Sequence, residues 1–185
     1  IELENLAVPY PKLDASRLQV FPLSERRHLL DFAAGAADPD AEPPPVSDAI
    51  AEQIDRVAER FRAARQAGAS TMLTYGAHLV KNYAAPLVRW LIEQKSLTHL
   101  ATQGAGVIHD WEFAYQGHSG ESVRENAPAG RFGAWDETGF ALNLAAVAGA
   151  AEGLGLGEAV GRFIVDDGWE LPAAEVLIEQ IRHAP

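Results

Sequence analysis

Apolar residues recur at helical spacing between Ser47 and Gly68. Ile50, Ile54 and Val57 lie three or four positions apart, and charged residues occupy positions between them. This spacing is typical of an amphipathic helix, for which Ser47 is the predicted N-cap and Gly68 marks the end. We expect the most regular helix of the chain in this segment.

Two short runs without a polar face each end in a glycine-containing turn and lead into a helical pattern. The first covers residues 70–74 and its turn residues 75–77, and the second covers residues 98–102 and its turn residues 103–106. Such runs are typical of buried parallel strands. Because crossover connections are right-handed, we predict two parallel strands with both turns at the same edge of the sheet.

Helical patterns account for much of the remaining chain. A short helix is predicted from Ser24 to Ala33, and no third strand is expected after Thr102. Trp90 and Trp111 occupy helix positions and are predicted to belong to the core. The remaining helices are predicted at residues 86–95, 108–115, 138–151, 157–165 and 172–183.

Prolines separate an N-terminal arm from the rest of the chain. Residues 1–22 contain scattered prolines and no sustained period, and residues 35–45 contain four more prolines. Successive prolines remove amide donors and bias each preceding residue toward extended geometry, which excludes a helix. We predict an arm with a proline-rich linker over residues 1–46 and one domain over residues 47–185.

The predicted fold class is α/β, with a Rossmann-like parallel sheet that carries helices on both faces. Two parallel strands are too few for a stable sheet of this kind. Further strands are therefore expected from the arm, from a longer chain or from a partner. Truncation is the preferred explanation because the sequence stops just after a predicted helix, so the fold is expected to be incomplete here.

A long connection rich in glycine and polar residues covers residues 116–136. Its length favours either a functional loop or a partly disordered one, and the sequence leaves both open. Asp136 is interpreted as the N-cap of the next helix with Glu137 in its first turn, and a ligand-facing role is the alternative. Arg131 and Trp135 are candidates to close over a bound ligand.

The composition excludes several classes of function. The 185 residues include no cysteine, which excludes disulfides, thiolate metal sites and a cysteine nucleophile. The formal net charge of -11 disfavours binding to nucleic acid. No apolar run has the length of a membrane span and residues 1–5 do not resemble a signal peptide, so we expect no membrane partner and a cytoplasmic location.

The two turns are the candidate ligand site, because open parallel sheets bind ligands beyond the carboxyl ends of their strands. Glycine lets the backbone approach a phosphate or sugar closely, and the following helices offer free amides. Glycines that serve only a tight turn are an equally weighted alternative. The candidate binding residues from this placement are Gly76, Ala77, His78, Thr102, Gly104, Ala105 and Gly106.

His78 and His109 follow the two strands, so both can face one ligand. Each is a candidate for hydrogen bonding or acid–base chemistry, with Asp110 and Glu112 nearby. No spacing supplies the three or four convergent ligands of a metal site, so no metal is predicted. Lys81 is interpreted as a solvated helix lysine, with an imine-forming lysine as the alternative.

Two motifs in this region resemble the deoxyhypusine synthase family. They are T-Y-G-A-H-L-V-K at residues 74–81 and T-Q-G-A-G-V-I-H-D at residues 102–110, joined by a helix of matching length. The family has a glycine-tyrosine-threonine-serine-asparagine turn and then threonine-threonine-alanine-glycine-glycine-valine-glutamate-glutamate-aspartate. The resemblance keeps the order and spacing of both motifs.

The resemblance implies a Rossmann-like fold in which both turns hold NAD. It further implies a homo-oligomer, tetrameric in the family, that moves the butylamine part of spermidine onto a lysine of a translation factor. Asp110 matches the family identically and joins the candidate cofactor-binding residues. His109 and Glu137 are the candidate substrate-binding residues.

The chain departs from the family where catalysis is concerned. Ile108 and His109 replace both glutamates of the second motif, and the family's imine-forming lysine lies past the end of this sequence. One hypothesis is an NAD-dependent amine or alkylamine transferase, whose lysine a longer chain would supply. The others are a non-catalytic ligand-binding or assembly module, and a different enzyme of the fold with His78 or His109 as general base.

Overall fold

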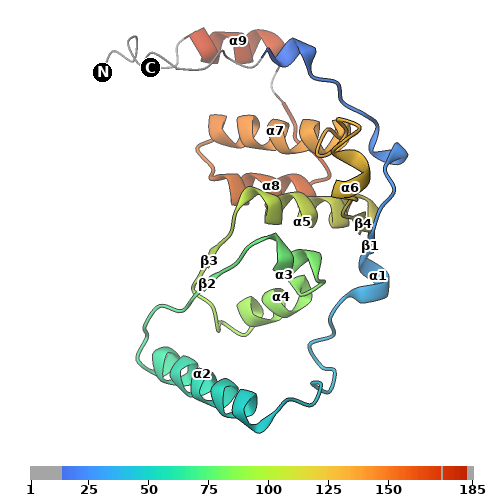
Figure 1. Cartoon of the computed structure of the whole chain (residues 1–185). Helices are drawn as coiled ribbons and strands as arrows, with labels where there is room; N and C mark the ends of the chain where they lie inside the picture. Colours follow the sequence, from blue (N-terminus) through green and yellow to red (C-terminus); the bar gives the residue numbers. More distant parts are fainter. Residues whose placement is uncertain (1–13, 172, 183–185) are drawn as a thin grey trace, which may run out of the picture.

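The structure is a computed structural model that describes residues 14–171 and 173–182 (Figure 1). Helices dominate these residues, and the strands form two separate two-stranded sheets. The chain is therefore mixed α/β. The described residues form no larger sheet, so the Rossmann-like arrangement with helices on both faces is not confirmed.

The two predicted parallel strands are confirmed, and they pair with each other. Leu73 lies opposite Leu100, and Thr74 lies opposite Ala101. The pairing places the carboxyl ends of both strands, and the turns that follow them, at one edge of the sheet. The elements of this part are β2 (Met72–Thr74), α3 (Ala77–Lys81), α4 (Ala85–Glu93), β3 (His99–Ala101) and α5 (Gly104–Gln116).

Two further helices pack with α5 and enclose much of the core (Figure 1). These are α7 (Asp136–Ala151) and α8 (Leu156–Val165), which pack on each other and on α5. A Cβ added at Gly149 would lie 2.3 Å from the Cβ of Ala159, so only glycine permits this close approach of α7 and α8. The buried cluster between the helices consists of Leu23, Trp111, Trp135, Ala141, Ala145 and Val160, which confirms Trp111 as a core residue.

The predicted helix over residues 24–33 is wrong. The chain instead forms a single 3-10 turn, η2 (Leu23–Glu25), then a short strand, β1 (Leu30–Asp31), and a one-turn helix, α1 (Phe32–Gly35). β1 pairs antiparallel with β4 (His118–Ser119), which lies inside the long connection after α5. Strands of two residues are too short for a period to reveal them in the sequence.

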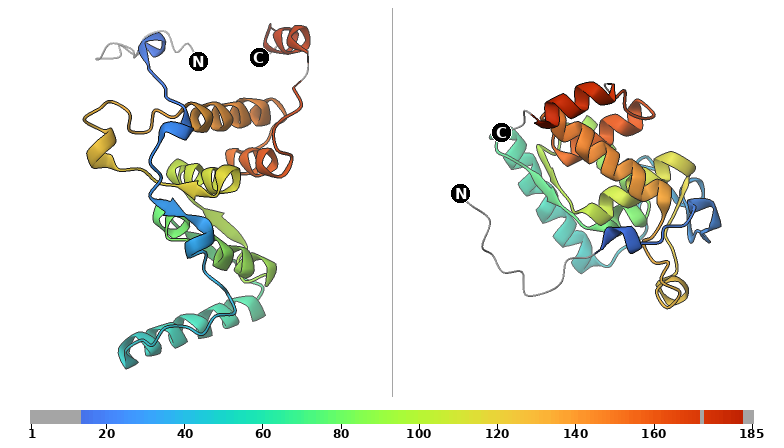
Figure 2. Two further views of the ribbon diagram at one scale, coloured as in Figure 1. Left: turned by 90° about the vertical axis from the view of Figure 1, so that its right-hand side faces the viewer. Right: turned by 90° about the horizontal axis from the view of Figure 1, so that it is seen from above.

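Part of the predicted arm packs against the helical core. The segment begins with η1 (Ala15–Arg17) and runs down one side of the molecule (Figure 2, left). Leu23 is 1% exposed, and its backbone N–H donates to the carboxylate of Glu137 at 2.6 Å. The boundary proposed at residue 46 stays a prediction, and residues 1–13 lie outside the described residues.

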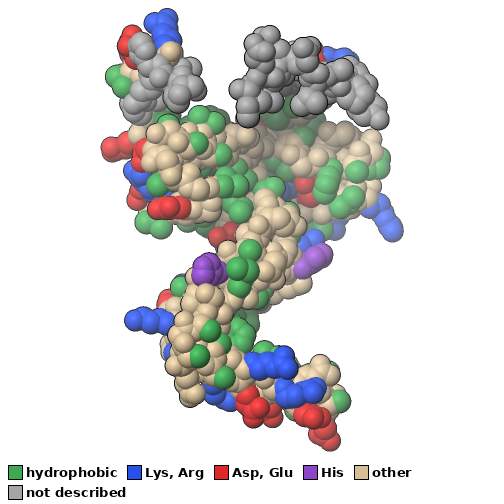
Figure 3. All heavy atoms as spheres, turned by 90° about the vertical axis from the view of Figure 1, so that its left-hand side faces the viewer, with side chains coloured by type: hydrophobic (Ala, Val, Ile, Leu, Met, Phe, Trp, Pro, Cys, Tyr) green, Lys and Arg blue, Asp and Glu red, His purple; other side chains and the backbone are tan. Residues whose placement is uncertain are grey.

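The most regular predicted helix is confirmed as α2 (Asp48–Gln66), with Ser47 at its N-cap. It stands apart from the helical core at the lower end of the molecule (Figure 1), where Figure 3 shows charged side chains gathered. Its apolar positions are not covered by the described part of the chain, since Ile50, Ile54 and Val57 are 50%, 54% and 56% exposed.

The long connection over residues 116–136 is held by hydrogen bonds. Within it, α6 (Val123–Asn126) follows β4. The carboxylate of Glu121 accepts hydrogen bonds from the Asn126 side chain at 2.7 Å and from the indole of Trp135 at 2.9 Å. Trp135 is the N-cap of α7 and Asp136 is its first residue, so the predicted capping role of Asp136 is wrong.

The other predicted helices are found with shifted ends. α5 begins at Gly104 instead of residue 108, because the side chain of Gln103 caps its first turn. α9 (Ala174–Arg182) matches the helix predicted over residues 172–183, whose two end residues lie outside the described residues. Trp90 is 41% exposed, so its assignment to the core is wrong.

Among the described residues, no single helix is both long and apolar enough to cross a membrane. α7 and α8 pass that test of length and composition only as a pair, with a bend of 114° between them.

Candidate functional site

The carboxyl edge of the parallel sheet is where the chain turns from β2 into α3 and from β3 into α5. Gly76 is the N-cap of α3, and Gln103 is the N-cap of α5, so both helices begin at this edge. The arrangement brings together the residues predicted from the two turns. They are Gly76, Ala77, His78, Thr102, Gly104, Ala105 and Gly106.

The first turn of α5 is packed tightly on one side and open on the other. The Oε1 atom of Gln103 accepts the backbone N–H of Ala105 at 2.9 Å, which satisfies one free amide of the helix. A Cβ at Gly106 would lie 2.6 Å from Thr102 Oγ1, so packing alone requires glycine there. No atom of the described residues lies within 4 Å of a Cβ built at Gly104, so the space beside that residue is open in this part of the chain.

Asp110, which the resemblance assigns to the site, lies within electrostatic reach of Tyr75. The residue is exposed by surface area, yet enough protein surrounds its carboxyl group for desolvation to raise its pKa. Burial also raises the pKa of the Tyr75 phenol, and the charge of Asp110 adds to the rise, while a hydrogen bond with Thr102 opposes it. The pair offers an acceptor and a donor for ligand hydroxyls.

His109 connects the α3 side of α5 to a buried polar network. Its Nδ1 atom lies 2.7 Å from the Oγ atom of Ser119, a residue of β4 that is 0% exposed. Burial lowers the pKa of His109, and Glu112 opposes this effect. Electrostatic repulsion from Lys81 and Arg26, and the interaction with His78, lower the pKa of His109 further.

Glu112 is the centre of this buried network and is 1% exposed. Its carboxylate accepts two hydrogen bonds from Arg26, at 2.8 and 2.7 Å, one from Ser119 Oγ at 2.5 Å and one from Thr138 Oγ1 at 3.0 Å. Burial by itself would raise the pKa of Glu112, but the hydrogen bonds from Arg26 and Ser119 outweigh burial and lower it. A carboxylate has about four acceptor positions, so the network uses its full capacity.

The network continues from Arg26 to a second pair of histidines. Arg26 Nε donates to His28 Nδ1 at 3.2 Å, and the His28 ring stacks on His118 with 5.8 Å between centroids. Burial lowers the pKa of His28, and the positive charges of Arg26 and His118 lower it further, against the effect of Glu112. In the described ranges, no three histidine or carboxylate side chains converge to hold a metal ion.

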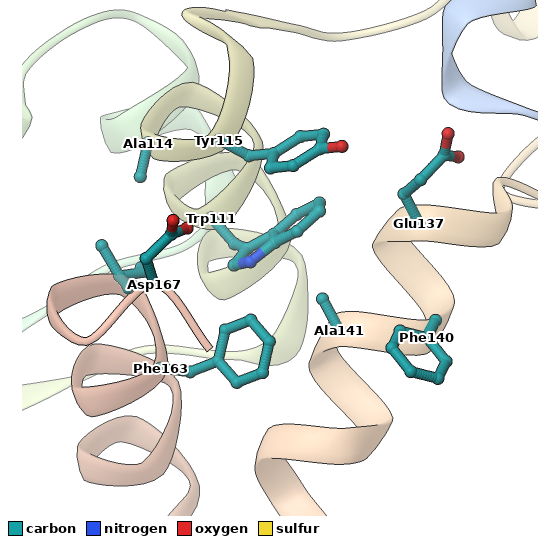
Figure 4. A pocket seen from close by; sticks show the side chains of 9 residues that line it. Trp111, Ala114, Tyr115, Glu137, Phe140, Ala141, Phe163 and Asp167 are labelled. Atoms are coloured by element: carbon teal, nitrogen blue, oxygen red, sulfur yellow. The ribbon is translucent and has the colours of Figure 1, made fainter. Parts of the chain in front are cut away.

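A separate cavity of about 290 Å³ lies between α5, α7 and the end of α8 (Figure 4). Trp111 and Tyr115 stack with 4.8 Å between ring centroids and form one wall. The carboxylates of Glu137 and Asp167 approach from opposite sides in Figure 4. Among the described residues, no lysine or arginine lines this cavity, and the two charged side chains there are both acidic.

Several residues singled out in the sequence have structural partners. One carboxylate oxygen of Glu137 accepts the N–H of Leu23, although the residue also lines the aromatic cavity. Trp135 is 3% exposed and belongs to the core, and Arg131 pairs with Glu25 and lies over the Phe21 ring. Arg131 and Trp135 therefore hold the chain together at the start of α7. Because Trp135 is buried in the core, its predicted role in closing over a ligand is wrong, whereas that of Arg131 stays a prediction.

The sequence pointed to His109 and Glu112 but not to the partners that organise them. Arg26 falls in a segment predicted to be an ordinary helix, and it reaches Glu112 across 86 positions of sequence. Ser119 lies in a polar, glycine-rich connection where a serine is unremarkable by composition. Thr138 lies in the first turn of a helix. Threonine is common near helix N-termini because its hydroxyl can accept a hydrogen bond from a free backbone N–H group, so it gives no sign of a buried network.

Comparison of the chain with family models, curated proteins and solved structures gives no match.

Proposed function

We propose that the chain is a deoxyhypusine-synthase-like module that binds NAD or a related nucleotide at the carboxyl edge of β2 and β3. The supporting observation is the parallel pairing of these strands, because it brings both turns of the resemblance to one edge. In parallel sheets this edge is the usual position of a nucleotide. A Rossmann-like sheet completed by further strands is part of the same proposal.

The open side of Gly104 provides room for the ligand. A phosphate or sugar can approach the backbone there without meeting a side chain. His78 is exposed at the start of α3, and Asp110 is a carboxylate that can accept a ribose hydroxyl. Gly106 has a packing role instead, because Thr102 fills the space beside it.

We propose the aromatic cavity as the place where an amine substrate binds, which corresponds to an alkylamine transferase. Trp111 and Tyr115 offer aromatic faces, and Glu137 and Asp167 offer negative charge. Aromatic faces with nearby carboxylates attract organic cations. A transferase that works through an imine also needs a lysine, and Lys81 at the end of α3 is not among the residues that line this cavity, so it is not placed to act on an amine bound there.

The second candidate function is a non-catalytic ligand-binding or assembly module. The observation in its favour is that Glu112 is fully engaged by Arg26, Ser119 and Thr138, so it cannot replace the two glutamates missing at residues 108 and 109. This module would bind the nucleotide without turnover.

A homo-oligomer, with the tetramer of the family as the reference, is part of the proposal. The uncovered apolar positions of α2 support it, and so do the free edges of a parallel sheet that has only two strands in the described residues.

Calorimetric titration of NAD into the protein tests the nucleotide proposal. The variant Gly104→Val fills the open space and should weaken binding by at least about tenfold. Gly157→Val is the matched control, because Gly157 also lies in the first turn of a helix and a Cβ built there meets no atom of the described residues within 4 Å. No heat of binding with the natural chain, or equal binding by Gly104→Val, would contradict the proposal.

Titration of butylamine or spermidine, followed by tryptophan fluorescence, tests the amine proposal. Asp167→Asn removes one charge from the cavity and should weaken binding. Asparagine tolerates the positive φ of 50° at this position, so the backbone is preserved. Asp166→Asn, next in sequence but not lining the cavity, is the control. Equal affinities in both variants would contradict a cation site.

A further inference from the structure

We infer that His109 carries its ring proton on Nδ1 and presents an unprotonated Nε2 atom, which accepts a hydrogen bond or a proton from an O–H or N–H group of the ligand. Ser119 and Glu112 are the positioning residues that set this tautomer. The inference goes beyond the proposed nucleotide binding, since it holds for any ligand with such a donor.

Glu112 accepts hydrogen bonds and donates none. Two hydrogen bonds from Arg26, at 2.8 and 2.7 Å, reach its two oxygens. A guanidinium group stays protonated in proteins and has no acceptor. Against the effect of burial, the hydrogen bonds from Arg26 stabilise the carboxylate form and lower the pKa of Glu112, so Glu112 is an ionised acceptor at neutral pH.

Ser119 transmits this constraint to the histidine. Its hydroxyl has a single hydrogen, and the oxygen lies 2.5 Å from Glu112 Oε2. Because that carboxylate oxygen only accepts, the hydrogen of Ser119 lies between the two oxygens. Ser119 is 0% exposed, so water does not compete for it, and its oxygen is left with acceptor positions alone.

The acceptor positions of Ser119 determine the tautomer of His109. Nδ1 lies 2.7 Å from the serine oxygen and must donate, so it carries the proton. In a neutral imidazole the other nitrogen is then unprotonated. The ring is neutral because burial lowers its pKa. Lys81, Arg26 and His78 lower it further, and Glu112 alone opposes them.

The unprotonated Nε2 lies on the opposite edge of the ring from Ser119. His109 is half-buried, and Lys81 and His78 of α3, the helix that begins at the sheet edge, lie within electrostatic reach of its ring. The same placement excludes Ser119 as a nucleophile, because its oxygen is buried and its hydrogen is held by Glu112.

Proton transfer to this nitrogen would be balanced within the network. The ligand's O–H or N–H bond breaks, its electron pair stays on the oxygen or nitrogen, and the proton binds His109 Nε2. The imidazolium that forms keeps its Nδ1–H on Ser119, and the negative charge of Glu112 stabilises it through that serine. A carboxylate orients and stabilises the base in the same way in Ser-His-Asp triads, although no serine lies between the groups there.

Long-range ¹H–¹⁵N NMR of the ¹⁵N-labelled protein at neutral pH tests the inference without any ligand. His109 Nε2 should resonate in the range of an unprotonated nitrogen and Nδ1 in the range of a protonated one, with the signals assigned by His109→Gln. Ser119→Ala removes the acceptor and should shift both nitrogens toward a mixture of tautomers. Ser70→Ala, at an exposed serine, is the control and should shift neither.

The spectrum of the natural chain decides the question even if Ser119→Ala does not fold. A proton on Nε2, or a charged ring at neutral pH, would overturn the inference. Unchanged nitrogen shifts in folded Ser119→Ala would overturn the role of Ser119. Since no ligand is added, these outcomes are independent of whether NAD binds.

Discussion

Arg26 and Glu112 place two opposite charges in the interior, with side chains that are 3% and 1% exposed. Removing two charges from water costs several kcal/mol each, and their attraction offsets this cost only when the geometry is good and the remaining acceptors are filled. Ser119 and Thr138 fill those acceptors here. Replacing both charged residues should therefore reduce the stability of the fold less than replacing only one of them.

Arg26→Met should lower the free energy of unfolding by about 3–5 kcal/mol, because it leaves the charge of Glu112 buried without a partner. The double variant Arg26→Met/Glu112→Leu should lose less of the free energy of unfolding, because no unpaired charge stays buried. Urea denaturation followed by tryptophan fluorescence measures both. Arg27→Met is the control, since the exposed pair of Arg27 with Glu125 should contribute about 0–1 kcal/mol. Equal losses at Arg26 and Arg27 would contradict the prediction.

Stability should fall as the pH is lowered from 7 to 5, partly because of His109. Its pKa in the folded protein lies below the ordinary value of 6.5, so the unfolded state binds more protons in this window. The stabilisation is thus present above about pH 6.5 and is lost as the pH falls through the lowered pKa. His28, with a pKa lowered in the same direction, contributes in the same sense.

The measurement is the free energy of unfolding against pH for the natural chain and for His109→Gln. The variant should show a shallower slope, by at most about 1.4 kcal/mol per pH unit, which is the slope of one proton. His99→Gln, at an exposed histidine of β3, is the matched control and should change the slope less. A steeper slope in His109→Gln than in the natural chain would mean that folding raises the pKa of His109, which would contradict the lowered pKa.

Helix packing at the scale of elements depends on small residues between α7 and α8. Ala145, Ala148 and Ala159 are 1%, 6% and 1% exposed, and Gly149 allows the closest approach. A core built on alanine and glycine leaves little room for rearrangement, because interiors are close-packed. Added volume at the crossing must move a whole helix.

Gly149→Ala should destabilise the protein by about 1–3 kcal/mol, since the new methyl group would meet Ala159. Gly139→Ala, in the same helix with nothing within 4 Å of a built Cβ, should instead stabilise by up to about 1 kcal/mol through helix propensity. Thermal or urea unfolding compares the two. Stabilisation by both substitutions would contradict the close packing of α7 on α8.

At the scale of the whole molecule, the described residues leave two kinds of surface incomplete. α2 stands away from the other helices (Figure 2), and its apolar residues are half-exposed. The parallel sheet has two strands in the described part of the chain, fewer than a stable open sheet requires. Both features are expected of a protein that assembles with further copies.

Light scattering after size exclusion should therefore give a mass above that of one 19.9 kDa chain. Ile54→Asp places a charge on the apolar positions of α2 and should shift the mass toward the monomer. Ala63→Asp, nine positions later and therefore on the opposite face of the helix, adds the same charge away from the apolar positions and should leave the mass unchanged. A monomer for the natural chain would contradict the assembly.

The features predicted correctly are those set by neighbours in sequence. The hydrophobic period and the positions of proline and glycine correctly predicted α2, the two parallel strands and the turns after them. These signals depend only on residues a few positions apart. The predicted helix over residues 24–33 fails for the opposite reason. Its local pattern is overridden by partners far along the chain, to which Leu23, Arg26 and Leu30 are bound.

By itself, the sequence determined that two strand-turn-helix units follow each other and that His109 and Glu112 lie on the second of them. Only the tertiary structure decided that Arg26, Ser119 and Thr138 meet at Glu112 and that Ser119 orients His109. The physical reason is that a hydrogen bond between segments distant in sequence leaves no periodic trace along the chain. Its partners become visible only when packing brings the segments together.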